Sequence, residues 1–470
     1  MSEFSDKLKN YMKRSGHTTA SLSKLCNIDR TVFHKYGTGD RFPTDIKTVE
    51  IIADKLLLSI SDKNELTRLW RMEHVGKDLY VQREAVKHLL EGLNDFSSFN
   101  ISSSNFTTKC ELGKVGVINT TKNELELQMF IRNILAFEAT KNNLKVRMCV
   151  QPVYHNLIEM LLEYSQTLSF SVTQLVCFHQ HRDRIVNNIQ YIENILPLAF
   201  CLPDYQVKIY YDDADHHINN MSLLPNLILT DEFVILFSYD LKEGIVYHEK
   251  QIHAFYTEIF NKMSAQCKCI STYCQEPEEY INLLINKNFR FMLNQTPCLA
   301  MTFTREFLED VIIKEIPNRE AFIQAIIADM ERRIVEDASY FCNAFFTYKG
   351  VENFIQTGRN NEFPPEIYRQ LATNECKDLL KKQINTATNS CVNNYLLDET
   401  NFKYQSNVIV EIEPRGIVVF QKPTDQFYRK FVIFDESSIN ELFVDFFSNM
   451  EEMQYIKSQK DASDYLKSFI

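Results

Sequence analysis

Apolar side chains in the first sixty residues recur at helical spacing in four short runs that polar residues separate. In the first run, residues 4–14, Leu8, Tyr11 and Met12 fall on one face of a helix. Gly16 follows this run, and Thr18 or Thr19 is placed to cap the next. The fourth run begins at Thr44, after Pro43, and its apolar positions are Ile46, Val49, Ile52, Ala53 and Leu56. The pattern predicts a small all-helical domain with one shared core.

The second and third runs, residues 22–36, predict two short helices joined by a three-residue turn. The apolar positions are Leu22, Leu25 and Cys26 on the first helix, and Ile28, Phe33 and Tyr36 on the second. The turn contains Asn27, a residue type that adopts a left-handed conformation at low cost. Asp29 follows as the expected N-cap of the second helix. This layout is that of a helix-turn-helix.

Residues 4–60 resemble the Cro-repressor-like (XRE-type) helix-turn-helix family. The positions that match the family pattern are Leu22, Ile28, Phe33, Tyr36, Gly39 and Pro43. Three positions depart from it: Ser23 replaces the usual Ala, Asn27 the usual Gly and Gly37 the usual Glu. The first two changes are sterically reasonable. The third removes a carboxylate near the helix end and predicts that the second helix ends early.

A helix-turn-helix lays its second helix in the major groove of DNA and contacts bases with the early outward side chains. The spacing here assigns the base contacts to Arg30, Thr31, His34 and Lys35. Contacts to phosphates, which position the protein without specifying sequence, are expected from Thr19, Lys24, Thr38 and Arg41. The alternative for each residue is an ordinary solvated charge or hydroxyl.

Charge is distributed unevenly along the chain, whose formal net charge is −11. Residues 7–47 contain nine Lys or Arg against three Asp or Glu, a net of +6, so the remainder carries −17. A basic module attached to an acidic body fits a protein that reads DNA with one part only.

Residues 61–93 predict an amphipathic connecting helix that a capping box at Ser61–Glu65 opens and that Gly76 interrupts. Two interpretations stay open: the helix packs on its own domain, or it connects or dimerises the reader and the body. Residues 94–108 are rich in Ser, Asn, Thr and Phe and indicate a linker.

The body, residues 109–470, mixes helical and strand-like patterns, so the predicted fold class is a multidomain α+β protein: an all-α helix-turn-helix domain (residues 1–60) followed by a mixed α/β body. Helical spacing recurs at residues 123–139, 154–166, 182–196, 251–264, 304–313 and 318–345. Strand-like runs lie at residues 146–150, 207–211, 233–237, 408–412, 417–420 and 431–434.

A faint repeat divides the body into two similar halves, predicted as residues 109–275 and 276–470. Residues 230–237 lead to an aromatic helix that ends in Met263, and residues 412–420 lead to one that ends in Met450. The layout is similar to phospholipase D-like folds, which are also paired halves. Their His-x-Lys-x4-Asp signature fails here, because Phe255 stands where His248 and Lys250 require Asp. No catalytic role follows from this similarity.

Other chemistry in the body is weakly indicated. The eleven glycines build neither a dinucleotide nor a triphosphate cradle. Weak candidates for a metal or ligand site are the thiols Cys267, Cys269 and Cys274, the run of residues 210–217, the pair His179 and His181, and Arg359 as an anion contact. Each of these fits a structural or surface role better. We therefore expect no catalytic residue, no metal site and no cofactor.

The chain has twelve scattered cysteines, a polar start and no apolar run of 18 residues, which predicts a cytoplasmic protein without membrane segments. The sequence favours a DNA-binding transcriptional regulator, acting as a homodimer on double-stranded DNA, whose body senses a small-molecule or peptide effector. The alternatives are a body that is a hydrolase-like enzyme and a protein-interaction adaptor.

Overall fold

The computed structural model divides the chain into two compact units, Met1–Ala85 and Val86–Ile470, which we call unit 1 and unit 2. The residues that it describes are 2–94, 117–140, 144–165, 170–179, 184–202, 204–212, 223–273, 279, 283, 287–335, 342–361, 366–386, 392–414, 416–422 and 430–470.

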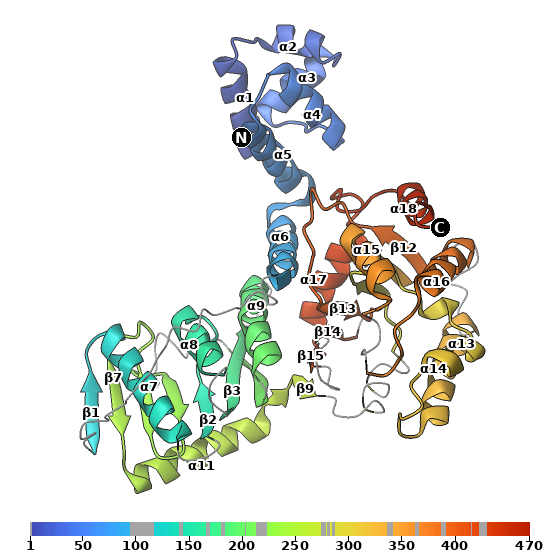
Figure 1. The fold of residues 1–470 in the computed structure, drawn as a ribbon. Helices are drawn as coiled ribbons and strands as arrows, with labels where there is room; N and C mark the ends of the chain where they lie inside the picture. Colours follow the sequence, from blue (N-terminus) through green and yellow to red (C-terminus); the bar gives the residue numbers. More distant parts are fainter. Residues whose placement is uncertain are drawn as a thin grey trace. The chain divides into compact units, whose positions relative to one another are not determined.

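Unit 1 is a bundle of helices around one apolar core (Figure 1). Its first helices are α1 (Glu3–Arg14), α2 (Thr19–Leu25), α3 (Arg30–Thr38), α4 (Ile46–Lys55) and α5 (Ile60–Val75). Most of the predicted inward side chains are buried, including Leu8, Phe33 and Val49. Leu25 is an exception: it was expected to face the core but is 49% exposed, because α2 ends there and its last turn lies at the surface.

The helix α5 belongs to the core of unit 1, so this folding unit extends beyond the predicted boundary at residue 60. Leu66, Leu69 and Trp70 of α5 are buried in the same apolar cluster as α1 to α4. Trp70 also donates from its indole N–H to the carbonyl oxygen of Pro43 at 2.7 Å. The N-cap of α5 is Ser59, which accepts from the backbone N–H of Asp62, and not the predicted Ser61.

The predicted break at Gly76 separates α5 from α6 (Lys77–Gly92), and the boundary between the units falls within α6. In unit 2, Val86, Leu89 and Leu90 of α6 are fully buried. The predicted linker begins at Asn94, whose side chain bonds to the backbone of Lys403 and Gln405. The rest of the linker, residues 95–108, lies outside the described residues.

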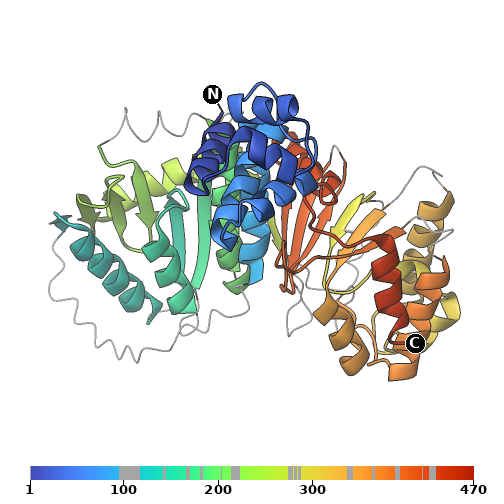
Figure 2. The ribbon, with the colours of Figure 1, turned by 90° about the horizontal axis from the view of Figure 1, so that it is seen from above.

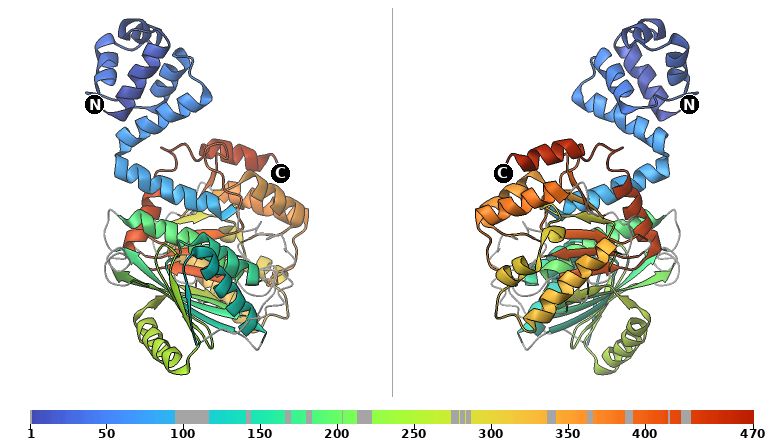
Figure 3. Two further views of the ribbon diagram at one scale, coloured as in Figure 1. Left: turned by 90° about the vertical axis from the view of Figure 1, so that its left-hand side faces the viewer. Right: turned by 90° about the vertical axis from the view of Figure 1, so that its right-hand side faces the viewer.

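Unit 2 contains two mixed sheets. Sheet A has the strand order β1-β7-β6-β5-β2-β3-β4-β8. The bounds of its strands are β1 (Ile118–Thr121), β2 (Leu144–Cys149), β3 (Phe170–His179), β4 (Asp204–Asp212), β5 (Asn226–Leu229), β6 (Val234–Phe237), β7 (Gly244–Tyr247) and β8 (Lys268–Cys269). The helices packed on this sheet are α7 (Glu124–Ala139), α8 (His155–Ser165), α9 (Ile185–Cys201) and α11 (Lys250–Gln266). In Figure 3, α11 lies on the opposite side of the sheet from α7 and α8.

Sheet B has the order β12-β11-β10-β13-β14-β15-β9. Its strands are β9 (Ser271–Tyr273), β10 (Phe291–Leu293), β11 (Cys342–Phe346), β12 (Val392–Leu396), β13 (Ile409–Ile412), β14 (Val418–Lys422) and β15 (Lys430–Phe434). The helices of this part are η3 (Ala300–Thr302), α13 (Arg305–Val311), α14 (Arg319–Val335), α15 (Tyr348–Thr357), α16 (Thr373–Thr386), α17 (Ser437–Ser448) and α18 (Gln459–Lys467). Figure 2 shows the two sheets and their helices from above.

The two sheets repeat one connectivity. In sheet A, β2, β3 and β4 are parallel neighbours, and β5, β6 and β7 follow antiparallel on the other side of β2. In sheet B, β10, β11 and β12 are parallel neighbours, and β13, β14 and β15 follow antiparallel on the other side of β10. The outer strands β1 and β9 also correspond, since each pairs antiparallel with the last strand of its set.

We call the strands β1–β8 with the helices α7, α8, α9 and α11 half one. The strands β9–β15 with the helices η3 and α13–α18 are half two. The division between the sheets falls at Ile270, between β8 and β9, a few residues before the predicted boundary at 275. The predicted helix at residues 318–345 is wrong at its end: α14 stops at Val335, and β11 occupies residues 342–346. The strands that were not predicted are β1, β3, β5, β7, β8, β9, β10, β11 and β12.

The two halves meet along β8, β9 and β15. The ring of Phe178 on β3 stacks on Phe434 of β15 with 6.3 Å between centroids. The ammonium group of Lys430 donates to the carbonyl oxygens of Leu202 at 2.6 Å and Phe200 at 3.3 Å, at the end of α9. Among the described helices, none is both long and apolar enough to cross a membrane.

Candidate nucleic-acid interface

The turn between α2 and α3 has the predicted geometry. Asn27 adopts a left-handed conformation with φ of 55°. The backbone N–H of Ile28 then donates to the carbonyl oxygen of Ser23 at 2.9 Å and closes the end of α2. Ser23 is buried, and its hydroxyl donates to the carbonyl oxygen of Ala20 at 3.1 Å. A small residue at this position therefore lets the two helices approach closely.

The helix α3 begins after Asp29, the residue that the sequence pattern identified as its N-cap. The Asp29 carboxylate accepts from the backbone N–H groups of Thr31 at 2.8 Å and Val32 at 3.1 Å. These bonds, that from Val32 foremost, hold the pKa of the Asp29 carboxyl below its usual value. Gly39 ends the helix with φ of 84°. The early end that Gly37 predicted is wrong, because α3 continues to Thr38.

One face of α3 is anchored in unit 1. Phe33 and Tyr36 are buried, and their ring centroids lie 6.0 Å apart. The Ser5 hydroxyl of α1 donates to the carbonyl oxygen of Tyr36 at 2.7 Å. These contacts fix the rotation of the helix about its axis and so determine which side chains point outward.

The four predicted base contacts lie together on the opposite face of α3. Arg30, Thr31, His34 and Lys35 are all exposed, and their spacing puts them on one side of the helix. Within the described part of the chain, Arg30, His34 and Lys35 form no ion pair, whereas cations elsewhere in unit 1 pair with carboxylates, as in the pairs Arg14–Asp62, Lys63–Asp54 and Arg68–Glu65. The outward face of α3 thus presents donors that are not engaged by carboxylates.

The four predicted phosphate contacts differ in their exposure and in whether their polar groups already have partners. Lys24 and Arg41 are exposed and, among the described residues, have no carboxylate partner. Thr19 is half-buried in the first turn of α2. Thr38 is the least suitable, because its hydroxyl donates to the Asp40 carboxylate at 2.6 Å. A phosphate only accepts hydrogen bonds, so Thr38 would first have to release Asp40.

Of the weak candidates for chemistry in the body, Tyr210, Asp212 and Cys267 line one hollow of unit 2, and the other described candidates lie apart from it. His179 is buried, its ring stacks on Tyr191, and Arg359 lies over the ring of Tyr368. Cys267 and Cys269 are free thiols, and burial raises the pKa of the Cys267 thiol. Cys274, His181, residues 213–217 and Phe363–Pro365 lie outside the described residues. Within the described part, no group of three or more His, Cys, Asp or Glu side chains is arranged to hold a metal ion.

The segment that resembles half of a phospholipase D signature is not repeated. His248 follows β7, stacks on Phe233 and lies 3.3 Å from the Glu232 carboxylate. The corresponding residue after β15 is Asp435, which pairs with Lys268 at 3.2 Å. The two halves therefore present different side chains at this equivalent turn.

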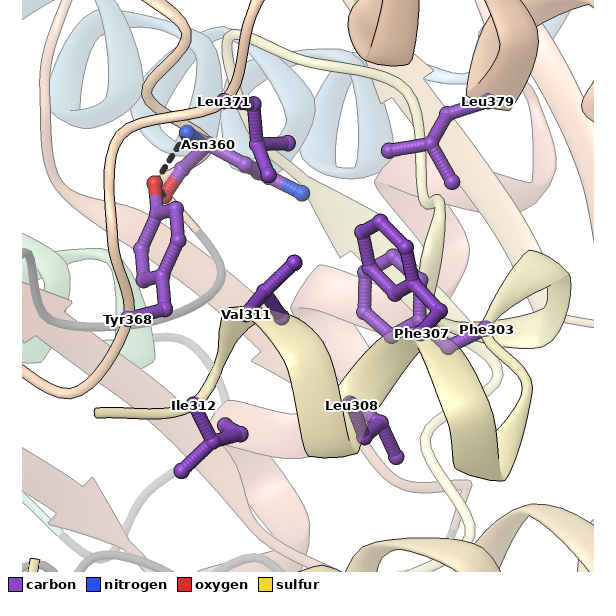
Figure 4. A pocket seen from close by; sticks show the side chains of 9 residues that line it. All are labelled: Phe303, Phe307, Leu308, Val311, Ile312, Asn360, Tyr368, Leu371 and Leu379. Atoms are coloured by element: carbon purple, nitrogen blue, oxygen red, sulfur yellow. Dashed lines mark hydrogen bonds between the residues drawn. The ribbon is translucent and has the colours of Figure 1, made fainter. Parts of the chain in front are cut away.

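Described residues of unit 2 line a small hollow and a large one. In half two, a space of about 20 Å³ is enclosed by Phe303, Val311, Tyr368 and other apolar side chains (Figure 4). In half one, a hollow of about 900 Å³ lies between α11 and sheet A. Sequence reasoning missed this second hollow, because its walls come from strands that are paired only in the folded chain.

Comparisons with known proteins identify no family for this chain. No protein-family model matches it, and no curated protein matches it. Among solved structures, the archaeal chromatin protein TrmBL2, described with a novel mode of DNA binding, is 12% identical over 46% of this chain and 72% of its own, with a TM-score of 0.23.

Two further solved structures are enzymes. The polyphosphate kinase of Porphyromonas gingivalis is 10% identical over 75% of this chain and 55% of its own, with a TM-score of 0.21. The phosphatidylserine synthase of Haemophilus influenzae Rd KW20 is 10% identical over 75% of this chain and 92% of its own, with a TM-score of 0.23. Likenesses this low say nothing about the function of this chain.

Proposed function

We propose that this protein is a sequence-specific DNA-binding transcriptional regulator whose unit 1 is an XRE-type helix-turn-helix reader. The observation that supports this most is the outward face of α3, where Arg30, Thr31, His34 and Lys35 are exposed together and no carboxylate pairs with the three basic side chains in the described structure. A face of this kind matches the acceptor-rich major groove.

In this proposal α3 enters the major groove. Arg30 and Lys35 donate to guanine O6 and N7, and the Thr31 methyl group contacts a thymine methyl. Lys24 and Arg41 neutralise phosphates beside the groove, with Thr19 and Thr38 as secondary contacts. His34 lies between Arg30 and Lys35 on the same face and completes the reading surface.

A single reader of this size spans a short half-site, so we also propose that the protein acts as a homodimer. Two apolar side chains of unit 1 support an interface of this kind. Leu57 is 91% exposed and Ile60 is 82% exposed, and both lie at the turn between α4 and α5. Leu57 also holds a left-handed conformation with φ of 52°, which is costly for leucine. A second copy of this turn would cover both side chains.

Unit 2 is proposed to sense an effector. The end of α6 in unit 2 contacts both halves: Glu91 accepts from the backbone N–H of Lys403 at 2.9 Å, and His88 lies 3.2 Å from the Glu193 carboxylate on α9. A change in how the two halves pack would therefore shift α6, the helix that continues from unit 2 into unit 1.

The decisive experiment measures binding of the full chain to its own upstream DNA at two salt concentrations. The double variant Arg30→Ala/Lys35→Ala should abolish specific binding, since each good base contact is worth about 1 to 3 kcal/mol. Lys24→Ala should weaken binding to all sequences and reduce the salt slope by about 1. Lys145→Ala, an exposed change in half one, is the control. If the full chain shows no salt-sensitive DNA binding, the regulator proposal is wrong and the adaptor alternative takes its place.

A further inference from the structure

The repeated connectivity allows the two halves to be compared residue by residue. Cys149 pairs across sheet A with Leu227 and Leu175, and Leu227 pairs with Leu236. Leu293 pairs across sheet B with Val410 and Phe345, and Val410 pairs with Phe420. The register thus matches Cys149 with Leu293, Leu175 with Phe345, Leu227 with Val410, and Leu236 with Phe420.

The helices that cover these matched strand positions, α11 in half one and α17 in half two, also correspond to each other. Both follow the last strand of their set and both have a glutamate at the N-cap, Glu249 in α11 and Glu436 in α17. Counted from these caps, Tyr256, Ile259 and Met263 of α11 match the following residues of α17 and its end: Phe443, Phe446 and Met450.

In half two this space is filled. Phe420 contacts Phe443 with 5.7 Å between ring centroids, and Phe345 contacts Phe447 with 5.4 Å between centroids. Six residues of α17 are buried, and Met450 is buried beyond its end. Half two therefore shows how densely this sheet and helix pack when large aromatic side chains occupy the row.

In half one the equivalent space is open. Leucine replaces phenylalanine at positions 175 and 236, and Phe260 is the one buried residue of α11, a helix of 17 residues. Leu175, Leu236, Tyr256, Ile259 and Met263 all line the hollow of about 900 Å³. That volume is within the range of about 300 to 1,000 Å³ found for small-molecule sites.

We propose that this hollow of half one is a binding site for a small molecule with a bulky apolar or aromatic body and no negative charge. The ligand body would occupy the space that the rings of Phe345 and Phe420 fill in half two, where half one has Leu175 and Leu236. The lining contains one carboxylate, Asp212, and no lysine or arginine, which disfavours phosphates and carboxylates. Tyr210 and Gln151 add polar groups to the lining, whereas the amide nitrogen of Asn226 already donates to the Tyr154 hydroxyl and to the carbonyl oxygens of Phe237 and Ser238.

The hollow in half two is the internal contrast. At about 20 Å³ it offers space for a single water at most, and its walls are largely apolar. It is a small packing defect of a core, whereas the hollow of half one has both the size and the mixed lining of a ligand site. If the proposed function is right, the ligand of this site is the effector, but the site itself can be tested without DNA.

The test is a titration of the full chain with Nile red, a neutral polarity-sensitive dye, followed by fluorescence. The wild-type chain should bind one equivalent of dye. The variant Leu175→Phe/Leu236→Phe installs the side chains of half two and should weaken dye binding by about tenfold or more. Leu125→Phe, which adds the same group at an exposed site on α7 outside the hollow, should bind dye within about twofold of wild type.

A second measurement makes the result independent of the dye. Because the hollow has room for two rings, the double variant should keep the melting temperature of the wild type within about 5 °C. A fall well beyond this would mean that the space is already filled and would overturn the proposal. Equal dye binding by the double variant and the wild type, or no dye binding by the wild type, would overturn it as well. If an anionic competitor displaced Nile red more strongly than a neutral competitor of similar size, the proposal of a ligand without negative charge would be wrong.

Discussion

Replacing Leu66 with alanine should unfold unit 1 at markedly lower denaturant concentration, because Leu66 places α5 in the core of unit 1. Its side chain is fully buried in the apolar cluster that also contains Phe4, Leu22 and Phe33. If this packing is correct, residues 60–75 are a structural part of unit 1 and not a free connector.

The magnitude follows from the atoms removed. Leucine to alanine deletes three buried carbon groups, and at about 0.8 kcal/mol each the lost transfer free energy is about 2.4 kcal/mol. The cavity that remains raises the total to about 3 to 4 kcal/mol. A unit of 85 residues has a free energy of unfolding of about 4 to 13 kcal/mol. The substitution therefore removes a large fraction of the stability of unit 1.

The assay uses the single tryptophan of the chain. Trp70 is 6% exposed and lies in unit 1, so its fluorescence during urea unfolding reports on this unit and not on unit 2. The midpoint of Leu66→Ala should fall by about 2 M urea. Asn64→Ala is the matched control on the same helix: Asn64 is exposed, and its loss should change stability by less than about 0.5 kcal/mol. Equal midpoints for the two variants would refute the assignment of α5 to this core.

Three further predictions concern other parts of the chain. Burial lowers the pKa of Lys430 to about 8, so between pH 8 and 10.5 the unfolded chain binds more protons than the folded chain. The free energy of unfolding should therefore rise with pH in this range by at most about 3 kcal/mol, and urea titrations of Lys430→Met should lack this rise. Leu57→Asn relieves a left-handed leucine and should stabilise unit 1 by about 1 kcal/mol in the Trp70 assay, while weakening the proposed dimer in ultracentrifugation. Gly350→Ala would press a Cβ atom onto the carbonyl oxygen of Gln295 and should lower the stability of unit 2 by about 2 kcal/mol in thermal unfolding. The added Cβ atom of Gly37→Ala meets only the side chain of Lys9, so this control should stabilise α3 by about 0.5 to 1 kcal/mol; equal effects of the two substitutions would contradict this packing.

The local features of unit 1 could be predicted because short-range chemistry determines them. The left-handed Asn27, the N-cap Asp29 and the inward Phe33 depend on neighbours within one or two turns of helix. The errors are also local in kind. Ser59 and Ser61 both precede an apolar run, and the sequence alone does not say which of the two accepts the first backbone N–H.

The strands that were missed are short or are buried on both faces. All four residues of β5 are buried, and β3 is buried along its second half. Without a solvent-facing side these strands lack the alternation that marks a strand in a sequence. The first four residues of β11 were added to the helix before them for the same reason, since a short apolar run fits either structure.

The two candidate sites, the exposed face of α3 and the hollow of half one, also differ in how far the sequence could predict them. The exposed face of α3 could be identified from spacing alone, because one helix carries it. The engagement of Thr38 by Asp40 depends on the turn after Gly39 and was not foreseen. The hollow of half one could be recognised only after β2, β3, β5 and β6 were paired, since its walls combine residues far apart in the sequence.

The hollow of half one is not a sign of a loosely packed half. On the other side of sheet A, Ile134, Leu161 and Ile192 of the helices α7, α8 and α9 are buried to 1% exposure or less. The same sheet is therefore closely packed on one face and open beneath α11 on the other. Half two, with the same connectivity, is packed by Phe443 and Phe446 at the matching place. A general lack of packing would affect both faces, so an open space confined to one helix and one row of strands fits a site that the fold keeps for a ligand.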